Sequence, residues 1–284
     1  MPDHFTEFIA VILIFSGTAY LNRYHKQAEK YVREKKYPEA IKAYSRLLIL
    51  NQRSHHTLIM RGWANYEAGN LDKAIEDFSK IIKYEPRNSE VYGMRGFVYA
   101  VMKNDEAALR DFNRFIEFNP EEARSYLSRA RLRFNSHEYD EAINDYHNAL
   151  LLLEAELKKN SQPKHFYHNI DTQDFSNRIA NSYVDRGLAY AKTKNYLSAI
   201  LDYSRALELD PKNTQAFSNR ALAYLHTSKF EEAIEDFSTS ILLDLKDVFN
   251  FVWRGETFLK LKNCEAAIKD LTEAVKLNAD DPEY

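Results

Sequence analysis

The sequence is poor in the residues that crosslink, interrupt or strongly charge a chain. Its 284 residues include one cysteine, seven glycines and seven prolines, and 42 acidic residues are nearly balanced by 39 basic ones. A single cysteine excludes a disulfide within the chain, although it does not identify the compartment. With no basic tract in view, nucleic acid and anionic lipid are poor default partners. No glycine-rich phosphate loop is present either, which argues against a nucleotide site.

Long apolar runs are also scarce, and the exception lies near the N-terminus. Residues 8–15, FIAVILIF, are continuously apolar, and the run weakens towards Leu21. The run at 8–21 is short for a membrane span, which needs roughly 20 residues. A cleavable signal peptide is less favoured, because no Lys or Arg precedes the run. Two interpretations are equally supported. The run is either a membrane anchor, which would leave the repeated units of a cytoplasmic protein on the cytosolic side, or a helix packed on the first repeated unit.

What the sequence has in abundance is self-similarity. The stretch RGWANYEAGNLDKAIEDFSKIIKYEP, residues 61–86, recurs with substitutions along almost the whole chain. Its signature alanine recurs every 34 residues, with one step of 57 residues in the middle. A 34-residue period predicts a solenoid of helix–turn–helix units. The alanines are Ala40, Ala74, Ala108, Ala142, Ala199, Ala233 and Ala267.

Seven copies, numbered one to seven below, can be aligned from these alanines. Each has a small residue at its eighth position and the alanine at its twentieth, and prolines end three of the second helices. This pattern resembles the tetratricopeptide repeat (TPR) family over residues 21–281, apart from one insertion. The resemblance implies an all-α solenoid, a right-handed superhelix of helix pairs, that acts as a non-enzymatic protein-interaction scaffold. The copies begin at residues 21, 55, 89, 123, 180, 214 and 248.

The interrupted period suggests how the chain is divided. An insertion of 23 residues separates copies four and five. We expect it to project as two lengthened helices, one ending near Asn160 and the next capped by Asp171 or Thr172, with a loop of about ten residues between them. The expected segments are an apolar N-terminal segment at 1–20, copies one to four at 21–156, the insertion at 157–179 and copies five to seven at 180–284.

A pair of opposite charges accompanies six of the copies. Position 7 is arginine and position 23 is aspartate in copies two to seven, whereas the first copy has Gln27 and Ala43. The joint loss predicts that the two positions pair across the helices, since the guanidinium fork suits a partly buried carboxylate. A polyanion-binding stripe is the less favoured interpretation. The pairs are Arg61 with Asp77, Arg95 with Asp111, Arg129 with Asp145, Arg186 with Asp202, Arg220 with Asp236 and Arg254 with Asp270.

Small side chains at the eighth position have a packing explanation. Glycine costs about 1 kcal/mol inside a helix relative to alanine, so four glycines at one place imply close contact. We expect the alanine of the second helix to approach there. Cys264, at position 17 of the last copy, is expected to be a small core residue. The small residues are Ala28, Gly62, Gly96, Ala130, Gly187, Ala221 and Gly255.

No catalytic constellation stands out. His165 and His168, with Asp171 nearby, have a spacing that suits a metal ion. They lie in an expected loop without further cysteine or histidine, and a zinc site needs three or four placed ligands. A nucleophile would have to sit on a scaffold whose residues are nearly all explained by repeat packing. We therefore expect no enzyme activity, no metal and no cofactor.

The TPR resemblance implies a concave binding face, lined by positions 2, 5, 6, 9, 12 and 13 of the first helices. Methionine and aromatic residues gather at these positions, which favours an apolar-anchored protein or peptide partner, with packing between first helices as the alternative. Among them, Arg131 is an isolated cation that would orient the bound chain. No three consecutive copies supply the Lys, Asn and Arg clamp by which chaperone adaptors hold acidic tails. The expected groove residues are Ile59, Met60, Trp63, Tyr66, Met94, Phe97, Leu127, Arg131, Phe134, Leu188, Asn219 and Leu222.

Overall fold

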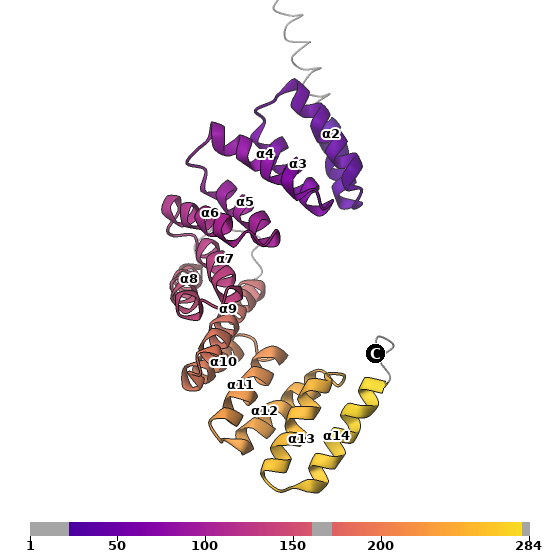
Figure 1. Ribbon diagram of the computed structural model, residues 1–284, viewed down its shortest axis with the longest axis vertical. Coiled ribbons are helices and arrows are strands. Elements are labelled where there is room, and N and C mark those ends of the chain that lie inside the picture. Colours follow the sequence, from indigo (N-terminus) through magenta and orange to yellow (C-terminus); the bar gives the residue numbers. More distant parts are fainter. Residues whose placement is uncertain (1–22, 161–171, 280–284) are drawn as a thin grey trace, which may run out of the picture. The chain divides into compact units, whose positions relative to one another are not determined.

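The computed structural model describes residues 23–160 and 172–279, and all regular structure in these ranges is α-helical (Figure 1). Residues 23–33 form the first described helix. It is followed by α2 (Tyr37–Leu50), α3 (His55–Glu67), α4 (Leu71–Tyr84), α5 (Ser89–Val101), α6 (Asp105–Phe118), α7 (Ala123–Asn135), α8 (Tyr139–Asn160), α9 (Thr172–Lys192), α10 (Tyr196–Leu209), α11 (Thr214–His226), α12 (Phe230–Leu243), α13 (Val248–Lys260) and α14 (Cys264–Ala279).

The helices pack in consecutive pairs. Helix α3 packs on α4, α5 on α6, α7 on α8, α9 on α10, α11 on α12 and α13 on α14. The second helix of a pair also packs on the first helix of the next, as α4 does on α5 and α12 does on α13. A helix pair cannot bury its apolar stripe alone, so stacking of neighbours supplies the core. The predicted all-α solenoid of helix pairs is confirmed.

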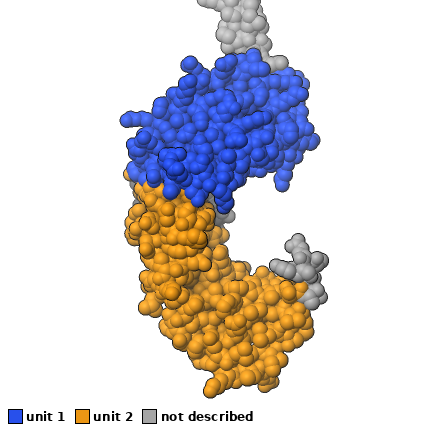
Figure 2. Space-filling model, in the orientation of Figure 1, with its two compact units in different colours: residues 1–120 blue, residues 121–284 orange. Residues whose placement is uncertain are grey.

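Two compact units divide the chain (Figure 2). Unit 1 spans residues 1–120 and unit 2 spans residues 121–284. In unit 1, Phe78 and Ile81 of α4 are fully buried against Leu58 of α3 and Val91 of α5. In unit 2, the buried cluster includes Tyr203. Each unit therefore has its own apolar core.

A residue with left-handed backbone closes the first helix of every described pair. Position 15 has a positive φ each time, and only one of these residues, Gly69 at φ 77°, is a glycine. The amide of the following residue then bonds back to the helix, as Asn70 does to the carbonyl of Asn65 at 2.8 Å. This hydrogen bond satisfies a carbonyl that the helix end leaves without a partner. The other six are Lys35, Lys103, His137, Lys194, Ser228 and Lys262.

The helices on either side of the insertion are lengthened, as the sequence predicts. Helix α8 has 22 residues and α9 has 21, compared with 14 in α10. Their extensions pack on each other, because Phe175 and Ile179 of α9 are buried with Leu153 of α8. The loop between them lies outside the described residues.

The contact at the eighth position differs from the expected one. A Cβ atom on Gly62 would lie 2.6 Å from the ring of Phe78, and one on Gly187 would lie 2.6 Å from the ring of Tyr203. The nearest contact at these two glycines is therefore the ring at position 24, one turn further along the second helix than the expected alanine. At Gly255 the alanine does approach, since a Cβ atom would lie 3.5 Å from the carbonyl oxygen of Ala267, with Leu271 at 3.1 Å.

Two further expectations concern the ends of the chain. Cys264 is exposed, so its assignment to the core is wrong. At the same position Tyr139 and Tyr196 are long enough to reach back and be half-buried, whereas a cysteine side chain is too short. None of the described helices combines the length and the apolar character needed to cross a bilayer. The apolar run at 8–21 lies outside the described residues.

Candidate functional site

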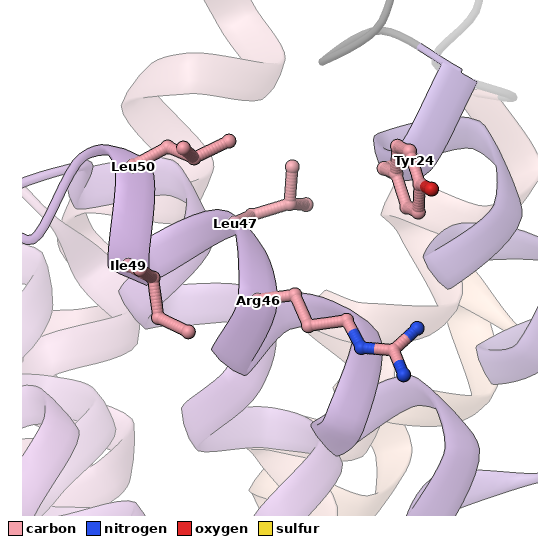
Figure 3. A pocket seen from close by; sticks show the side chains of 5 residues that line it. All are labelled: Tyr24, Arg46, Leu47, Ile49 and Leu50. Carbon is pink, nitrogen blue, oxygen red and sulfur yellow. The ribbon is translucent and has the colours of Figure 1, made fainter.

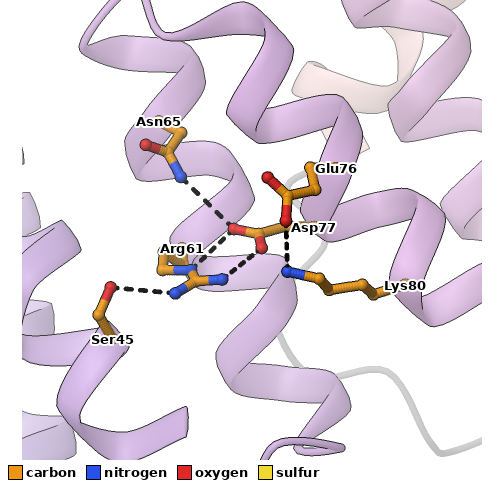
Figure 4. Close-up of polar contacts among 6 residues, drawn as sticks. All are labelled: Ser45, Arg61, Asn65, Glu76, Asp77 and Lys80. Carbon is orange, nitrogen blue, oxygen red and sulfur yellow. Dashed lines mark hydrogen bonds and ion pairs between the residues drawn. The ribbon is translucent and has the colours of Figure 1, made fainter. Parts of the chain in front are cut away.

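Every one of the six predicted Arg–Asp pairs forms. In copy two, the Arg61 Nε and Nη2 atoms donate to the two carboxylate oxygens of Asp77 at 2.8 and 2.5 Å (Figure 4). Asn65 adds a longer contact to the same carboxylate at 3.4 Å. The side chain of Asp77 is 2% exposed, so the pair is buried on the acidic side. Such a bidentate pair fixes the angle between the two helices as well as neutralising the charge.

The arginine also binds the preceding copy. In copies two, three, six and seven, its remaining Nη1 atom donates to a serine at position 25 of the copy before it. Arg61 bonds to Ser45 at 3.0 Å, and Arg220 bonds to Ser204 at 2.9 Å. The same contact joins Arg95 to Ser79 and Arg254 to Ser238. Each of these arginines therefore ties two helices of one copy to the second helix of its neighbour.

Electrostatics at these pairs reflect burial and pairing together. Burial raises the pKa of Asp236 above its usual range, while the hydrogen bond from Arg220 lowers it in part. The hydrogen bond that Arg220 donates to Asp236 in turn raises the pKa of Arg220. Since these guanidinium groups are engaged inside the array, they do not form a free polyanion-binding stripe.

On unit 1, the predicted groove residues include a compact aromatic group, called the aromatic patch below: Trp63, Tyr66 and Phe97. The Trp63 and Tyr66 ring centroids are 5.6 Å apart, and Phe97 lies 5.4 Å from Tyr66 and 6.1 Å from Trp63. Phe97 is 43% exposed, and Val101, one turn further along α5, is also 43% exposed. Trp63 and Tyr66 are half-buried, since Trp63 also contacts the buried ring of Phe78 at 5.7 Å.

The other predicted groove residues of unit 1 are more deeply engaged in packing. Ile59 and Met94 pack against the core around Phe78, and Met60 packs against the core of the first copy. All three are half-buried. Packing between first helices, the alternative interpretation, therefore accounts for part of the apolar character here.

In unit 2 the corresponding side chains are mostly half-buried. Leu127, Leu188 and Leu222 pack against the buried clusters of their helix pairs. Phe134 stacks edge-on against Tyr139 at 5.4 Å, and Asn219 is half-buried on α11. The exposed aromatic residue among the first helices of this unit is one outside the predicted set. It is Phe249, 44% exposed, which contacts Trp253 at 5.8 Å.

Arg131 is not an isolated cation, and that part of the prediction is wrong. Its Nε and Nη2 atoms both lie 3.3 Å from a carboxylate oxygen of Asp185 on α9. Burial raises the pKa of Asp185, and Arg131 counteracts the rise. The sequence separation of 54 residues spans the insertion, so no local spacing rule could have found this pair.

A cavity of about 380 Å³ opens in unit 1 (Figure 3). Tyr24 lines it from the first described helix, and Arg46, Leu47, Ile49 and Leu50 line it from the end of α2, so none of these residues belongs to the predicted groove. The described part of the lining contains no carboxylate, histidine or hydroxyl nucleophile beyond the tyrosine phenol, so these residues offer no acid–base pair for catalysis.

The described residues bring together no group of three potential metal ligands among His, Cys, Asp and Glu. The possible metal site suggested by the sequence, with His165, His168 and Asp171, lies outside the described residues.

Comparison with protein families gives matches along both units. Models described as tetratricopeptide repeat match residues 25–89, 180–213, 203–235 and 251–281. A comparison with curated proteins gives no match.

Several solved structures share the fold at low sequence identity. The C-terminal part of a TPR repeat-containing protein from Cytophaga hutchinsonii is 15% identical, with a TM-score of 0.68, over 91% of this chain and 96% of that chain. PilW, a type IV pilus biogenesis factor, is 14% identical, with a TM-score of 0.60, over 81% and 96%. YrrB, a TPR protein with an unusual peptide-binding site, is 19% identical, with a TM-score of 0.56, over 72% and 93%. Together with the paired helices and the matched segments, these likenesses establish that the chain carries tetratricopeptide repeats.

Proposed function

We propose that the chain is a non-enzymatic scaffold that binds a protein or peptide partner through apolar anchors on the first helices of its copies. The observation that carries this proposal is the aromatic patch, where Phe97 is 43% exposed beside Trp63 and Tyr66. Aromatic side chains left partly exposed together are typical of protein contact surfaces. Proteins of the TPR fold generally bind protein or peptide partners, and the patch gives this chain a specific place to do so.

The proposal includes the finer organisation read from the sequence. It treats the chain as seven copies of a variant with arginine at position 7 and aspartate at position 23. Copies one to four span 21–156 and copies five to seven span 180–284, with the insertion at 157–179 between them. The apolar segment at 1–20 precedes the copies in this scheme, either as a membrane anchor or as a helix packed on the first copy.

Within the partner site, we assign most of the binding energy to Trp63 and Phe97. Interface hot spots concentrate in aromatic and arginine residues, and their truncation costs about 2 kcal/mol or more. Few charges would take part, so affinity should depend only weakly on salt.

A second candidate is a membrane-anchored assembly factor with its copies in the cytosol. The observation that favours it is the apolar run at 8–15, followed by basic residues from Arg23 onward. Fractionation of the full-length chain, with and without detergent, separates this candidate from a scaffold without an anchor.

The binding proposal is tested by selecting peptides from a displayed random library on the wild-type chain. Peptides that anchor on the aromatic patch should lose binding to Trp63→Ala and to Phe97→Ala. Tyr84→Ala is the matched control, because Tyr84 is 45% exposed but lies on the second helix α4. If selected peptides bind all three variants as they bind the wild type, or lose affinity steeply with salt, the partner uses another surface.

A further inference from the structure

The first described helix carries a stripe of basic side chains, called the basic stripe below: Arg23, Lys26, Lys30 and Arg33. Their spacing of three, four and three residues places all four on one face of the helix at residues 23–33. All four are exposed. The opposite face packs inward through Ala28, which is fully buried against α2.

Comparison with the other copies shows that this face is unusual. Arg23 and Lys30 occupy positions 3 and 10 of copy one. In the later copies these positions hold small, apolar or uncharged side chains that are buried, such as Val91 and Val98 in α5, both 0% exposed. In copies two to seven, positions 3 and 10 of the first helix are thus covered by neighbours, whereas position 13 is exposed in each of them. In copy one, positions 3 and 10 are charged and open to solvent as well.

The charge of the first copy is opposite to that of the remainder. Residues 21–54 contain nine basic and three acidic residues, whereas the rest of the chain has 30 basic and 39 acidic residues. Among the described residues, Glu34 lies 3.7 Å from the stripe's Lys30 and pairs more closely with Lys36, at 2.8 Å, and Glu29 is a further carboxylate, on the same helix as the stripe. The near balance of the whole chain conceals this asymmetry.

Exposed apolar side chains lie at one end of the same helix pair. Ile49 and Leu50, at the end of α2, are 75% and 64% exposed. They line the cavity of about 380 Å³ together with Tyr24, which neighbours Arg23, and with Arg46, a further cation (Figure 3). The first copy thus carries an exposed basic stripe on one helix and, at the end of the other, two exposed aliphatic side chains beside Arg46.

We infer that the basic stripe is a docking surface for an anionic lipid bilayer. Three observations favour a bilayer over an acidic peptide. The cations lie along one exposed face of a helix, the exposed Ile49 and Leu50 belong to the same helix pair, and the sequence places the apolar run at 8–15 shortly before Arg23. Clusters of basic residues beside an apolar segment bind anionic headgroups, and stable attachment takes two such signals. This surface is separate from the aromatic patch and does not depend on the proposed peptide binding.

The test is co-sedimentation of the full chain with vesicles of phosphatidylcholine alone and of phosphatidylcholine containing phosphatidylserine. Any binding through the apolar run would contribute equally to both vesicle types, so the ratio of binding to the two vesicle types isolates the contribution of the stripe. Each basic residue near an anionic surface strengthens binding about fivefold. Lys26→Gln/Arg33→Gln, which removes two stripe cations, should therefore lower the preference for phosphatidylserine vesicles roughly 25-fold.

The matched control is Lys73→Gln/Lys83→Gln, which removes two exposed cations from α4 of the second copy. It should leave the preference unchanged, and both variants should keep the wild-type melting temperature. Equal binding to the two vesicle types by the wild type would overturn the proposal. So would an equal loss in both variants. Binding of a polyglutamate peptide without a vesicle preference would assign the stripe to an acidic protein partner instead.

Discussion

Replacing Arg220 by methionine would test how the buried ion pairs hold the array together. In the wild type, Arg220 donates to both oxygens of Asp236 at 2.7 Å and to the Ser204 hydroxyl at 2.9 Å. Methionine fills much of the same volume but offers no donor. The variant therefore leaves the Asp236 carboxylate, 5% exposed, without its cation.

Breaking a buried pair by removing one partner typically costs about 3–5 kcal/mol, because the remaining charge is left uncompensated. The lost serine contact adds about 1 kcal/mol at most. Removing both charges in Arg220→Met/Asp236→Leu should recover most of the loss, since a well-packed apolar pair can replace a buried ion pair. The destabilisation of Arg220→Met would thus come from the buried Asp236 carboxylate left without a cation, rather than from the lost attraction between Arg220 and Asp236.

The effect should also depend on pH. Burial raises the pKa of Asp236 in the folded chain, and loss of Arg220 removes the group that lowers it. A carboxyl with a raised folded pKa stabilises the fold when protonated, and this contribution disappears as the pH rises through the folded pKa. The penalty of Arg220→Met should therefore be largest at neutral pH and shrink as the pH falls towards about 4.

Denaturant unfolding with hydrogen exchange at α11 and α12 is the appropriate assay, because repeat arrays can lose their copies stepwise. Arg205→Met is the matched control. Arg205 pairs with Glu208 at the surface, with side chains 48% and 63% exposed, and lies 3.9 Å from the half-buried Glu154. Because its own side chain is solvated, its loss should cost no more than about 1 kcal/mol. The reasoning fails if Arg220→Met is no more destabilising than this control, or if the double variant is the least stable of the set.

Two other predictions follow from the packing and the titration of single residues. Gly187→Ala should lower stability by about 1–3 kcal/mol, because a Cβ atom there would lie 2.6 Å from the Tyr203 ring. An unfolding midpoint equal to that of the wild type would contradict this close contact. Burial and then the nearby His56 lower the pKa of His25, so stability present above about pH 6.5 should be lost as the pH falls through the folded pKa. His25→Gln should reduce the drop in unfolding midpoint between about pH 7.5 and 5.5, and an unchanged drop would assign it to other groups.

Much of the fold is predictable because it repeats. The 34-residue period predicts the helix pairs, and the joint loss of arginine and aspartate at Gln27 and Ala43 predicts the ion pairs. The 57-residue step predicts the lengthened α8 and α9. Because the signals recur at a fixed distance, an ambiguous residue in one copy can be assigned by comparison with the same position in the other copies. The left-handed turn at position 15 is not predictable from the sequence, because lysine, histidine and serine adopt this conformation in six copies and glycine, the usual signal, is present in one.

The candidate site is less predictable, because exposure depends on packing that a pattern does not resolve. Trp63 and Phe97 share the family's groove position, yet Trp63 rests on Phe78 while Phe97 stays 43% exposed. The sequence presents Arg131 as isolated because Asp185 is 54 residues away and belongs to another copy. It presents the basic stripe only as cations that follow the apolar run, since four spaced cations form a surface only when a helix aligns them.

Photo-crosslinking of a selected peptide to the full chain, with the products mapped by mass spectrometry, tests the central claim most directly. The account predicts crosslinks to α3 and α5 around Trp63 and Phe97, and their loss in Phe97→Ala. Crosslinks to exposed leucines on a second helix, such as Leu197 and Leu201 of α10 at 66% and 71% exposed, would contradict it.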